Sequence, residues 1–224
     1  MKVLSFPHGE VRFTDCIEAM RGLPDGAFDL CFTDPPYNID FCSEYTPDKL
    51  MYNDSMDDFP TFMEAWLTEA IRVANGVMFT PGGCHMWDYV VFRKPDYQLR
   101  VWYKSNAEGY NSHMEPFLAY GKIRNYSALR DVLDFVKADE PYYTHPTYKQ
   151  YDVWKHIIKK LAPESVIDPF LGSGTTAQAC EELGIPYLGF EIVDEYAADI
   201  EKRGNLGMKA YECRQAVGKQ KALF

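Results

Sequence analysis

The stretch Ser165-Val166-Ile167-Asp168-Pro169-Phe170-Leu171-Gly172-Ser173-Gly174-Thr175-Thr176 decides the fold class. Residues Ser165–Ile167 predict a short strand, and a helical pattern over Thr175–Leu183 follows the two glycines. A second strand, Pro186–Phe190, comes next and ends at Glu191. A strand, a tight glycine turn, a helix and another strand form a β-α-β unit, which predicts a mainly parallel sheet covered on both faces.

The same alternation extends over the rest of the chain. Further strands are predicted at Val11–Thr14, Phe28–Thr33, Gly76–Thr80, Leu99–Tyr103 and Pro116–Tyr120, and helices at Phe59–Ala74 and Tyr151–Leu161. The strands at Leu99–Tyr103 and Pro116–Tyr120 have no helix between them and predict an antiparallel edge pair. We therefore expect an α/β fold, with a doubly wound, mainly parallel sheet, in a single domain over residues 1–224.

Composition narrows the function classes. Of the 224 residues, 46% are hydrophobic and 25% are charged, which is ordinary for a globular protein. No apolar run is long enough for a transmembrane helix or a secretory signal, so we expect a cytoplasmic protein without a membrane partner. The six cysteines have no C-x-x-C spacing, so no metal site is predicted, and Cys16, Cys31 and Cys180 are expected to be buried thiols.

The net charge of −10 disfavours nucleic-acid binding, but the charges are segregated. Asn38–Glu69 has eight acids and one base, whereas Arg93–Arg130 has seven bases and three acids. The basic segment can face phosphate, or it can be an ordinary solvated surface. The candidate nucleic-acid-binding residues are Arg93, Lys94, Arg100, Lys104, Lys122 and Arg124.

The glycine turn has the features of a nucleoside site. Gly172 and Gly174 let the backbone approach a ligand closely, and the N–H groups at the start of the following helix favour an anion such as a carboxylate. Glu191 can accept hydrogen bonds from both ribose hydroxyls. No lysine follows the glycines, which excludes the phosphate loop of an NTPase. The alternative is a tight turn without a ligand.

A second turn, Thr33-Asp34-Pro35-Pro36-Tyr37-Asn38, follows the strand at Phe28–Thr33. Two prolines make it stiff and leave carbonyl groups free to accept hydrogen bonds. Asp34 offers a carboxylate, Pro35 a backbone carbonyl and Tyr37 an aromatic face, which together suit an exocyclic amine on a flat ring. The alternative is a proline-rich turn with an exposed tyrosine.

Together these motifs resemble the β-class S-adenosylmethionine-dependent amino-methyltransferases of DNA. The Asp-Pro-Pro-Tyr turn (33–38) resembles their catalytic motif, and Asp168–Thr176 resembles their cofactor loop. His145-Pro146-Thr147-Tyr148-Lys149 resembles the segment that precedes this loop in the β class, and the order of the motifs is that of the class. The resemblance runs from Val11 to about Asp194, and implies a Rossmann-like methyltransferase fold and a role in DNA methylation and restriction–modification.

The resemblance also implies roles for individual residues. The catalytic residues would be Asp34, Pro35, Pro36 and Tyr37. S-adenosylmethionine would be bound by Asp15, Cys16, Asp34, Thr147, Lys149, Asp168, Pro169, Phe170, Gly172, Ser173, Gly174, Thr175, Thr176 and Glu191. Within that set, Asp15 would meet the adenine amine, Glu191 the ribose, and Thr147 and Lys149 the methionine carboxylate. Trp102 with Lys104, and Glu115 in His113-Met114-Glu115-Pro116, resemble late-strand segments of the class.

Two departures from the family pattern affect these expectations. Gln150 stands where the family usually has a proline. The target-recognition region is reduced to about 125–144, so a separate recognition domain is minimal or absent. We therefore expect weak DNA binding by a monomer, strengthened by a homodimer or by a separate specificity partner.

Several functions remain open at this point. Asp34 favours adenine N6 as the acceptor by family usage, while cytosine N4 presents the same two N–H bonds. The acceptor amine can also belong to RNA. A protein glutamine is disfavoured as the acceptor, because glutamine methyltransferases usually have Asn in the place of Asp34. A non-catalytic nucleic-acid-binding subunit would keep the fold. A nucleotide-dependent oxidoreductase would share the glycine turn but have no use for Asp-Pro-Pro-Tyr.

Overall fold

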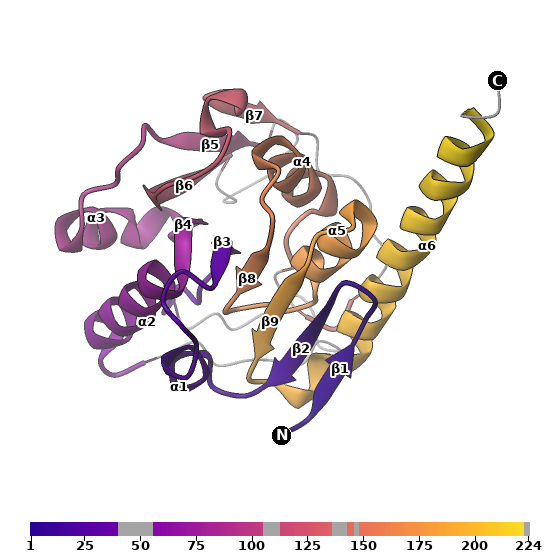
Figure 1. Cartoon of the computed structure of the whole chain (residues 1–224). Coiled ribbons are helices and arrows are strands. Elements are labelled where there is room, and N and C mark those ends of the chain that lie inside the picture. Colours follow the sequence, from indigo (N-terminus) through magenta and orange to yellow (C-terminus); the bar gives the residue numbers. More distant parts are fainter. Residues whose placement is uncertain (40–55, 105–112, 136–142, 146–147, 222–224) are drawn as a thin grey trace.

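The computed structural model describes residues 1–39, 56–104, 113–135, 143–145 and 148–221 (Figure 1). Within these residues one sheet has the strand order β1-β2-β9-β8-β3-β4-β6-β5-β7. The strands are β1 (Val3–Ser5), β2 (Gly9–Phe13), β3 (Phe28–Thr33), β4 (Ala74–Phe79), β5 (Arg100–Tyr103), β6 (Met114–Gly121), β7 (Val132–Asp134), β8 (Val166–Asp168) and β9 (Tyr187–Glu191). The helices are α1 (Cys16–Arg21), α2 (Phe59–Val73), α3 (Gly82–Phe92), α4 (Tyr151–Leu161), α5 (Thr175–Leu183) and α6 (Ala197–Lys221), with short 3₁₀ turns at Tyr126–Ala128 and Asp194–Tyr196.

The centre of the sheet is parallel, as predicted. Strands β2, β9, β8, β3 and β4 run in the same direction, and β6 is antiparallel to both β4 and β5. The expected antiparallel pair is therefore present as β5 and β6. Its position at the edge is corrected, because β7 pairs with β5 on the outer side. At the opposite edge β1 adds an antiparallel strand beside β2.

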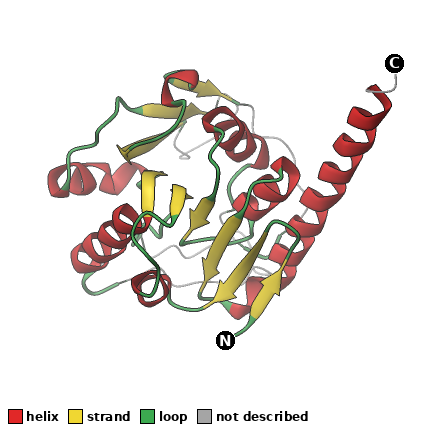
Figure 2. Ribbon diagram, viewed as in Figure 1, coloured by secondary structure: helices red, strands yellow, loops and turns green. Residues whose placement is uncertain are grey.

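Helices cover both faces of the sheet, which confirms the doubly wound architecture (Figure 2). Alternate residues of a strand point to opposite faces. Leu30 and Phe32 of β3 accordingly lie in one core with residues of α4 and α5, whereas Cys31 lies in the other core with residues of α1 and α2. Cys16 and Cys180 are also buried, so the expectation for these three thiols is confirmed.

The predicted helices are found nearly residue for residue because their apolar spacing matches a buried face. Trp66, Leu67, Ala70 and Val73 of α2 are buried, and Asp58 caps this helix by accepting a hydrogen bond from Thr61 N at 3.2 Å. The sequence did not predict α6, whose apolar residues lack a clear helical period. This helix packs along α5, and its C-terminal part extends past the sheet (Figure 1).

Part of the segment predicted as a recognition insert (125–144) belongs to the sheet. Its described residues form the 3₁₀ turn Tyr126–Ala128 and strand β7, with Leu133 buried. Residues 136–142 lie outside the described part, as do residues 40–55 of the acidic segment Asn38–Glu69. Part of the sequence between β6 and α4 therefore forms elements of the fold itself, in place of a recognition insert.

Candidate active site

The predicted site residues follow the central parallel strands, and the strands bring them to one edge of the sheet. Thr14 N donates to Glu191 O at 2.8 Å where β2 and β9 end, and Thr80 N donates to Thr33 O at 3.4 Å where β3 and β4 end. Asp168 is the last residue of β8, between these two pairs of strands. The expected convergence of the strand ends is therefore confirmed.

The glycine turn after β8 requires glycine for steric reasons. Gly172 has φ +56° and Gly174 has φ +90°, both in the left-handed region. A Cβ atom at Gly172 would lie 3.0 Å from His145 Nε2, and one at Gly174 would lie 3.1 Å from the Ile200 Cα. Helix α5 begins directly after the turn, so its positive N-terminal end lies at this edge of the sheet.

Glu191 lies beside this turn and is 8% exposed. Its Oε2 accepts from Gly172 N at 2.8 Å, and its Oε1 accepts from Ile192 N and Val193 N, both at 2.9 Å. Burial raises the pKa of Glu191 to about 7, although the three backbone N–H groups favour the charged form. A carboxylate held in this way keeps a fixed orientation and can accept further hydrogen bonds.

Asp168 connects the glycine turn to the Asp-Pro-Pro-Tyr turn. Thr33 Oγ1 donates to Asp168 Oδ1 at 2.5 Å, and Phe170 N donates to the same oxygen at 3.0 Å. Both Thr33 and Asp168 are buried, and burial raises the pKa of Asp168 to about 6. The two turns are thus joined by a buried hydrogen bond between β3 and β8.

The remaining predicted cofactor residues surround this centre. Asp15 is exposed, and its Oδ1 caps α1 by accepting from Glu18 N at 2.9 Å. The half-buried ring of Phe170 packs edge-on against Trp66, with ring centroids 5.4 Å apart. The others that the structure describes are buried: Cys16, Pro169, Ser173, Thr175 and Thr176. Thr147 lies outside the described residues.

The Asp34 side chain lies in a cluster of polar groups from four parts of the chain. Tyr37 Oη donates to Asp34 Oδ1, and Lys149 Nζ lies 3.2 Å from the same oxygen. Lys149 also donates to Tyr37 Oη at 2.9 Å and to Glu115. Thr80 Oγ1 lies 3.3 Å from Tyr37 Oη. The Tyr37 ring packs beside Gly82, where a Cβ atom would lie 3.0 Å from the ring.

This arrangement differs from the expectation for Lys149. The family resemblance implied a position near a methionine carboxylate, but the ammonium group points to Asp34 and Glu115. Only its backbone carbonyl lies at the start of α5, where it accepts from Thr175 Oγ1 at 3.2 Å. Lys104, predicted as a phosphate contact, lies in the same cluster with its Nζ 3.2 Å from Glu115 Oε2.

Electrostatics distinguish the two carboxylates of the cluster. Burial raises the pKa of Asp34 to about 6, against the opposing influence of Lys149. Burial also acts on Glu115, but the ammonium groups of Lys149 and Lys104 bring its pKa below the usual range. Asp34 is thus the carboxyl group that can exchange a proton near neutral pH. Sequence reasoning noted Glu115 without giving it a role, since its partners are distant in the chain.

Apart from Lys104, the basic candidates do not belong to the cluster at Asp34. Lys122 and Arg124 follow β6 and lie at the amino end of β4, because β6 is antiparallel to β4. Arg100 begins β5 and pairs with Phe117 in the middle of β6. Arg100 pairs with Asp131 at 2.8 Å, and Arg124 pairs with Glu164. Arg93 and Lys94 are exposed after α3. A strand of six residues spans about 20 Å, so Lys122 and Arg124 lie far from Asp34, at the opposite end of the parallel strands.

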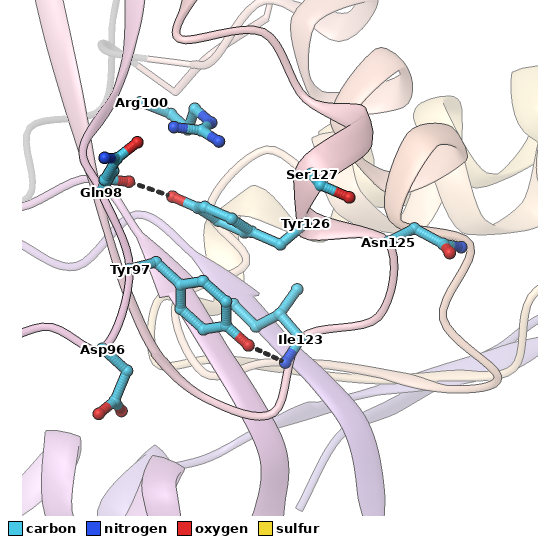
Figure 3. A pocket seen from close by; sticks show the side chains of 8 residues that line it. All are labelled: Asp96, Tyr97, Gln98, Arg100, Ile123, Asn125, Tyr126 and Ser127. Atoms are coloured by element: carbon cyan, nitrogen blue, oxygen red, sulfur yellow. Dashed lines mark hydrogen bonds between the residues drawn. The ribbon is translucent and has the colours of Figure 1, made fainter.

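A hollow of about 550 Å³ lies at this opposite end (Figure 3). Its polar groups are largely used within the protein, since Tyr126 Oη donates to Gln98 O at 2.6 Å and Ile123 N donates to Tyr97 Oη at 2.9 Å. The lining residues are Asp96, Tyr97, Gln98, Arg100, Ile123, Asn125, Tyr126 and Ser127. The hollow is therefore separate from the candidate active site.

Comparisons with known proteins match a part of the chain that contains several residues of this edge. A family model described as DNA methylase matches residues 129–202, which include Lys149, the glycine turn and Glu191. Over these residues the chain is similar to the N6/N4-type DNA methylases. The Type II methyltransferase M.HpaI of Haemophilus parainfluenzae is 25% identical over 236 residues, which cover 85% of this chain and 72% of that protein.

Two solved structures share the fold of this chain. The cytosine-N4-specific PvuII DNA methyltransferase has a TM-score of 0.67 at 13% identity, with 93% of each chain covered. The M1.HpyAVI–SAM complex has a TM-score of 0.63 at 21% identity, and covers 88% of this chain and 100% of that one. Both confirm the Rossmann-like methyltransferase fold. In the described part of the chain, no helix is both long and apolar enough to cross a membrane.

The Thr33–Asp168 hydrogen bond predicts a pH-dependent loss of stability in Thr33→Val. The folded protein has the higher Asp168 pKa, so the stability contributed by the protonated carboxyl is lost as pH rises from about 4 through 6. Loss of the hydroxyl donor raises this pKa further. We expect Thr33→Val to lower the free energy of unfolding by about 1–3 kcal/mol at pH 8 and by less at pH 5, measured by urea unfolding.

Thr68→Val, at an exposed position of α2, is the control and should show no such difference between the two pH values. An equal cost of Thr33→Val at both pH values would contradict the assigned hydrogen bond.

Proposed function

We propose that this chain transfers a methyl group from S-adenosylmethionine to the exocyclic amine of a base in DNA, with adenine N6 as the acceptor. The observation that carries the proposal is the buried link between the Asp34 turn and the glycine turn, through Thr33 and Asp168. It holds a carboxylate suited to an amine beside a turn suited to a nucleoside. The similarity to DNA methylases supports the same reaction.

The residues at the carboxyl edge fit S-adenosylmethionine. The glycine turn leaves no space for side chains, Glu191 presents a fixed carboxylate for ribose hydroxyls, and the start of α5 favours the methionine carboxylate. Asp15 would meet the adenine amine, and Phe170 would line the methionine and ribose portion. When bound, this cofactor supplies a methyl group on a positively charged sulfur, which keeps the bonding electron pair on transfer to the amine.

The protein itself must make the amine nucleophilic, because the lone pair of an aromatic amine is delocalised into the ring. Hydrogen bonds from the two N–H groups to the Asp34 carboxylate and the Pro35 carbonyl favour a pyramidal nitrogen with a localised lone pair. The carboxylate stabilises the positive charge that develops on nitrogen. Asp34, whose pKa is about 6, or a water molecule then takes the extra proton.

The target base must leave the double helix to reach Asp34. Unstacking costs about a few kcal/mol and is partly offset by stacking in the site. Pro36 keeps the turn stiff and Tyr37 contributes the aromatic ring, whose hydroxyl is held by Asp34 and Lys149. The hydroxyl bonds fix the plane of the ring before the base arrives.

The acceptor base is the finer part of the proposal. Family usage of Asp at the head of the tetrapeptide favours adenine, whereas a structural neighbour is a cytosine-N4-specific enzyme. We expect N6-methyladenine when methylated mixed-sequence DNA is digested to nucleosides and separated by chromatography. N4-methylcytosine as the sole product would assign the alternative acceptor.

Asp34→Ala should abolish methyl transfer while the fold is retained. The variant lacks the carboxylate that accepts from the amine, and we expect transfer of labelled methyl to DNA to fall by about a thousandfold or more. Asp152→Ala, on the exposed surface of α4, is the matched control. Full turnover by Asp34→Ala would refute the mechanism, and a wild-type chain that binds DNA without methylating it would indicate a non-catalytic subunit.

Glu191 makes cofactor binding depend on pH. The charged form accepts hydroxyl hydrogen bonds, and with a pKa of about 7 it is largely lost at pH 6. Calorimetry should show one site whose affinity falls roughly tenfold from pH 8 to pH 6. Glu191→Gln should bind weakly at both pH values, whereas Glu201→Gln on the exposed face of α6 should behave like wild type. Binding of NAD in place of S-adenosylmethionine would favour an oxidoreductase.

DNA binding by one copy should be weak, because the chain is acidic and Arg100 and Arg124 are already paired with acidic side chains. A homodimer, or a separate specificity partner, would supply the missing phosphate contacts. We expect the apparent DNA affinity to rise with protein concentration together with the dimer fraction in sedimentation. Tight, salt-resistant and site-selective binding by a proven monomer would contradict this.

A further inference from the structure

The polar cluster at Asp34 contains charges that the reaction described above does not use. Among the described residues it joins two carboxylates, Asp34 and Glu115, to two ammonium groups, Lys149 and Lys104. Their side chains are only 10–23% exposed. Charges this far from water are costly unless they are paired, so each group constrains the position of the others.

Lys149 occupies the place that an amine needs. Its Nζ lies 3.2 Å from Asp34 Oδ1, at the outer limit of an N–H···O hydrogen bond. A base amine that donates to Asp34 must come equally close to that carboxylate. An amine that donates to this same oxygen would then compete with the ammonium for it.

Glu115 offers Lys149 an alternative partner without loss of pairing. The ammonium donates to Glu115 and, at 2.9 Å, to Tyr37 Oη. With these two contacts the buried ammonium of Lys149 keeps hydrogen-bond partners when Asp34 accepts from the base amine. Lys104, 3.2 Å from the other oxygen of Glu115, holds that carboxylate from the far side.

We infer that Lys149 fills the amine position in the base-free protein and that Glu115 withdraws it from Asp34 when the base enters. The inference rests on the proposed function. Lys149 and Glu115 are then positioning residues, which act through Asp34 and do not contact the reacting nitrogen.

The charge balance explains why Glu115 is needed. The amine nitrogen becomes positive as it gains the methyl group, and then passes one proton to the Asp34 carboxylate. An Asp34 still paired with Lys149 would be a poor partner for that positive nitrogen. With Lys149 neutralised by Glu115, the negative charge of Asp34 is available to the reacting nitrogen.

The groups that face Asp34 come from every element around it. Within the described residues they are Tyr37 from its own turn, Thr80 after β4, Tyr89 on α3, Glu115 on β6 with Lys104 on β5 behind it, and Lys149 before α4. Lys149 lowers the pKa of Asp34 and Glu115 raises it, while burial brings the pKa to about 6. Removing the charge of Lys149 should therefore raise the pKa of Asp34, and removing the charge of Glu115 should lower it.

The test is the acid limb of the pH profile of kcat/KM for DNA methylation, which reports ionisation in the free protein. Lys149→Met should move this limb to higher pH by about one to three units, since the nearby positive charge is lost. Glu115→Gln should move it to lower pH and reduce kcat/KM by about tenfold, because Lys149 then stays on Asp34. The double variant should return towards wild type in both respects.

A matched control uses an ion pair of similar burial elsewhere. Lys155 on α4 pairs with Glu182 on α5 at 2.7 Å, and Lys155→Met should leave the limb in place. If a variant is folded but inactive, the pKa of Asp34 is followed by ¹³C NMR of its carboxyl carbon, with the same directions expected. If Lys149→Met does not fold, Lys104→Met should give a smaller shift of the same sign.

The outcomes separate the two proposals. The inference is overturned, and the function left intact, if the wild-type chain methylates DNA but the acid limb of kcat/KM lies at the same pH in all variants. In that case the double variant also shows no return of kcat/KM towards wild type. A wild-type chain that transfers no methyl to DNA overturns the function. The NMR titration then still shows whether Lys149 and Glu115 control Asp34.

Discussion

The hydrogen bond from Thr33 to Asp168 joins β3 and β8 at the point where both strands end. On the β3 side it fixes the start of the Asp-Pro-Pro-Tyr turn, and on the β8 side it fixes the start of the glycine turn. Asp168 also accepts from Phe170 N, so the same carboxyl shapes the loop that leads to α5. This buried contact, together with the backbone pairing of β3 and β8, therefore sets the relative position of the two turns.

Burial raises the pKa values of three carboxyl groups at this edge of the sheet. Asp34, Asp168 and Glu191 all have raised pKa values because the sheet and its helices exclude water from them. They differ in their partners: backbone N–H groups hold Glu191, a threonine hydroxyl holds Asp168, and an ammonium group faces Asp34. In the proposed function these three groups would serve as a nucleoside ligand, a structural link and a proton acceptor at one edge of the sheet.

Much of this could be predicted from local sequence. The glycine turn, the double-proline turn and the apolar spacing of α4 and α5 are determined by residues close together in the chain, and all of them form as predicted. Strand β7 and helix α6 lack such local signals and depend on packing against β5 and α5. The cluster of Lys149 with Glu115 joins residues 34 positions apart, so only the folded chain reveals it. The basic segment predicted the nucleic-acid-binding residues poorly, since Arg100 begins β5 whereas Lys104 follows its last residue.

The most direct measurement is a crystal structure of the protein with S-adenosylhomocysteine and a DNA duplex that contains a target base. The account predicts an extrahelical base whose amine donates to the Asp34 carboxylate, with Lys149 Nζ moved from Asp34 to Glu115 and the nucleoside held by Glu191. A base bound elsewhere, with Lys149 still on Asp34, would contradict it.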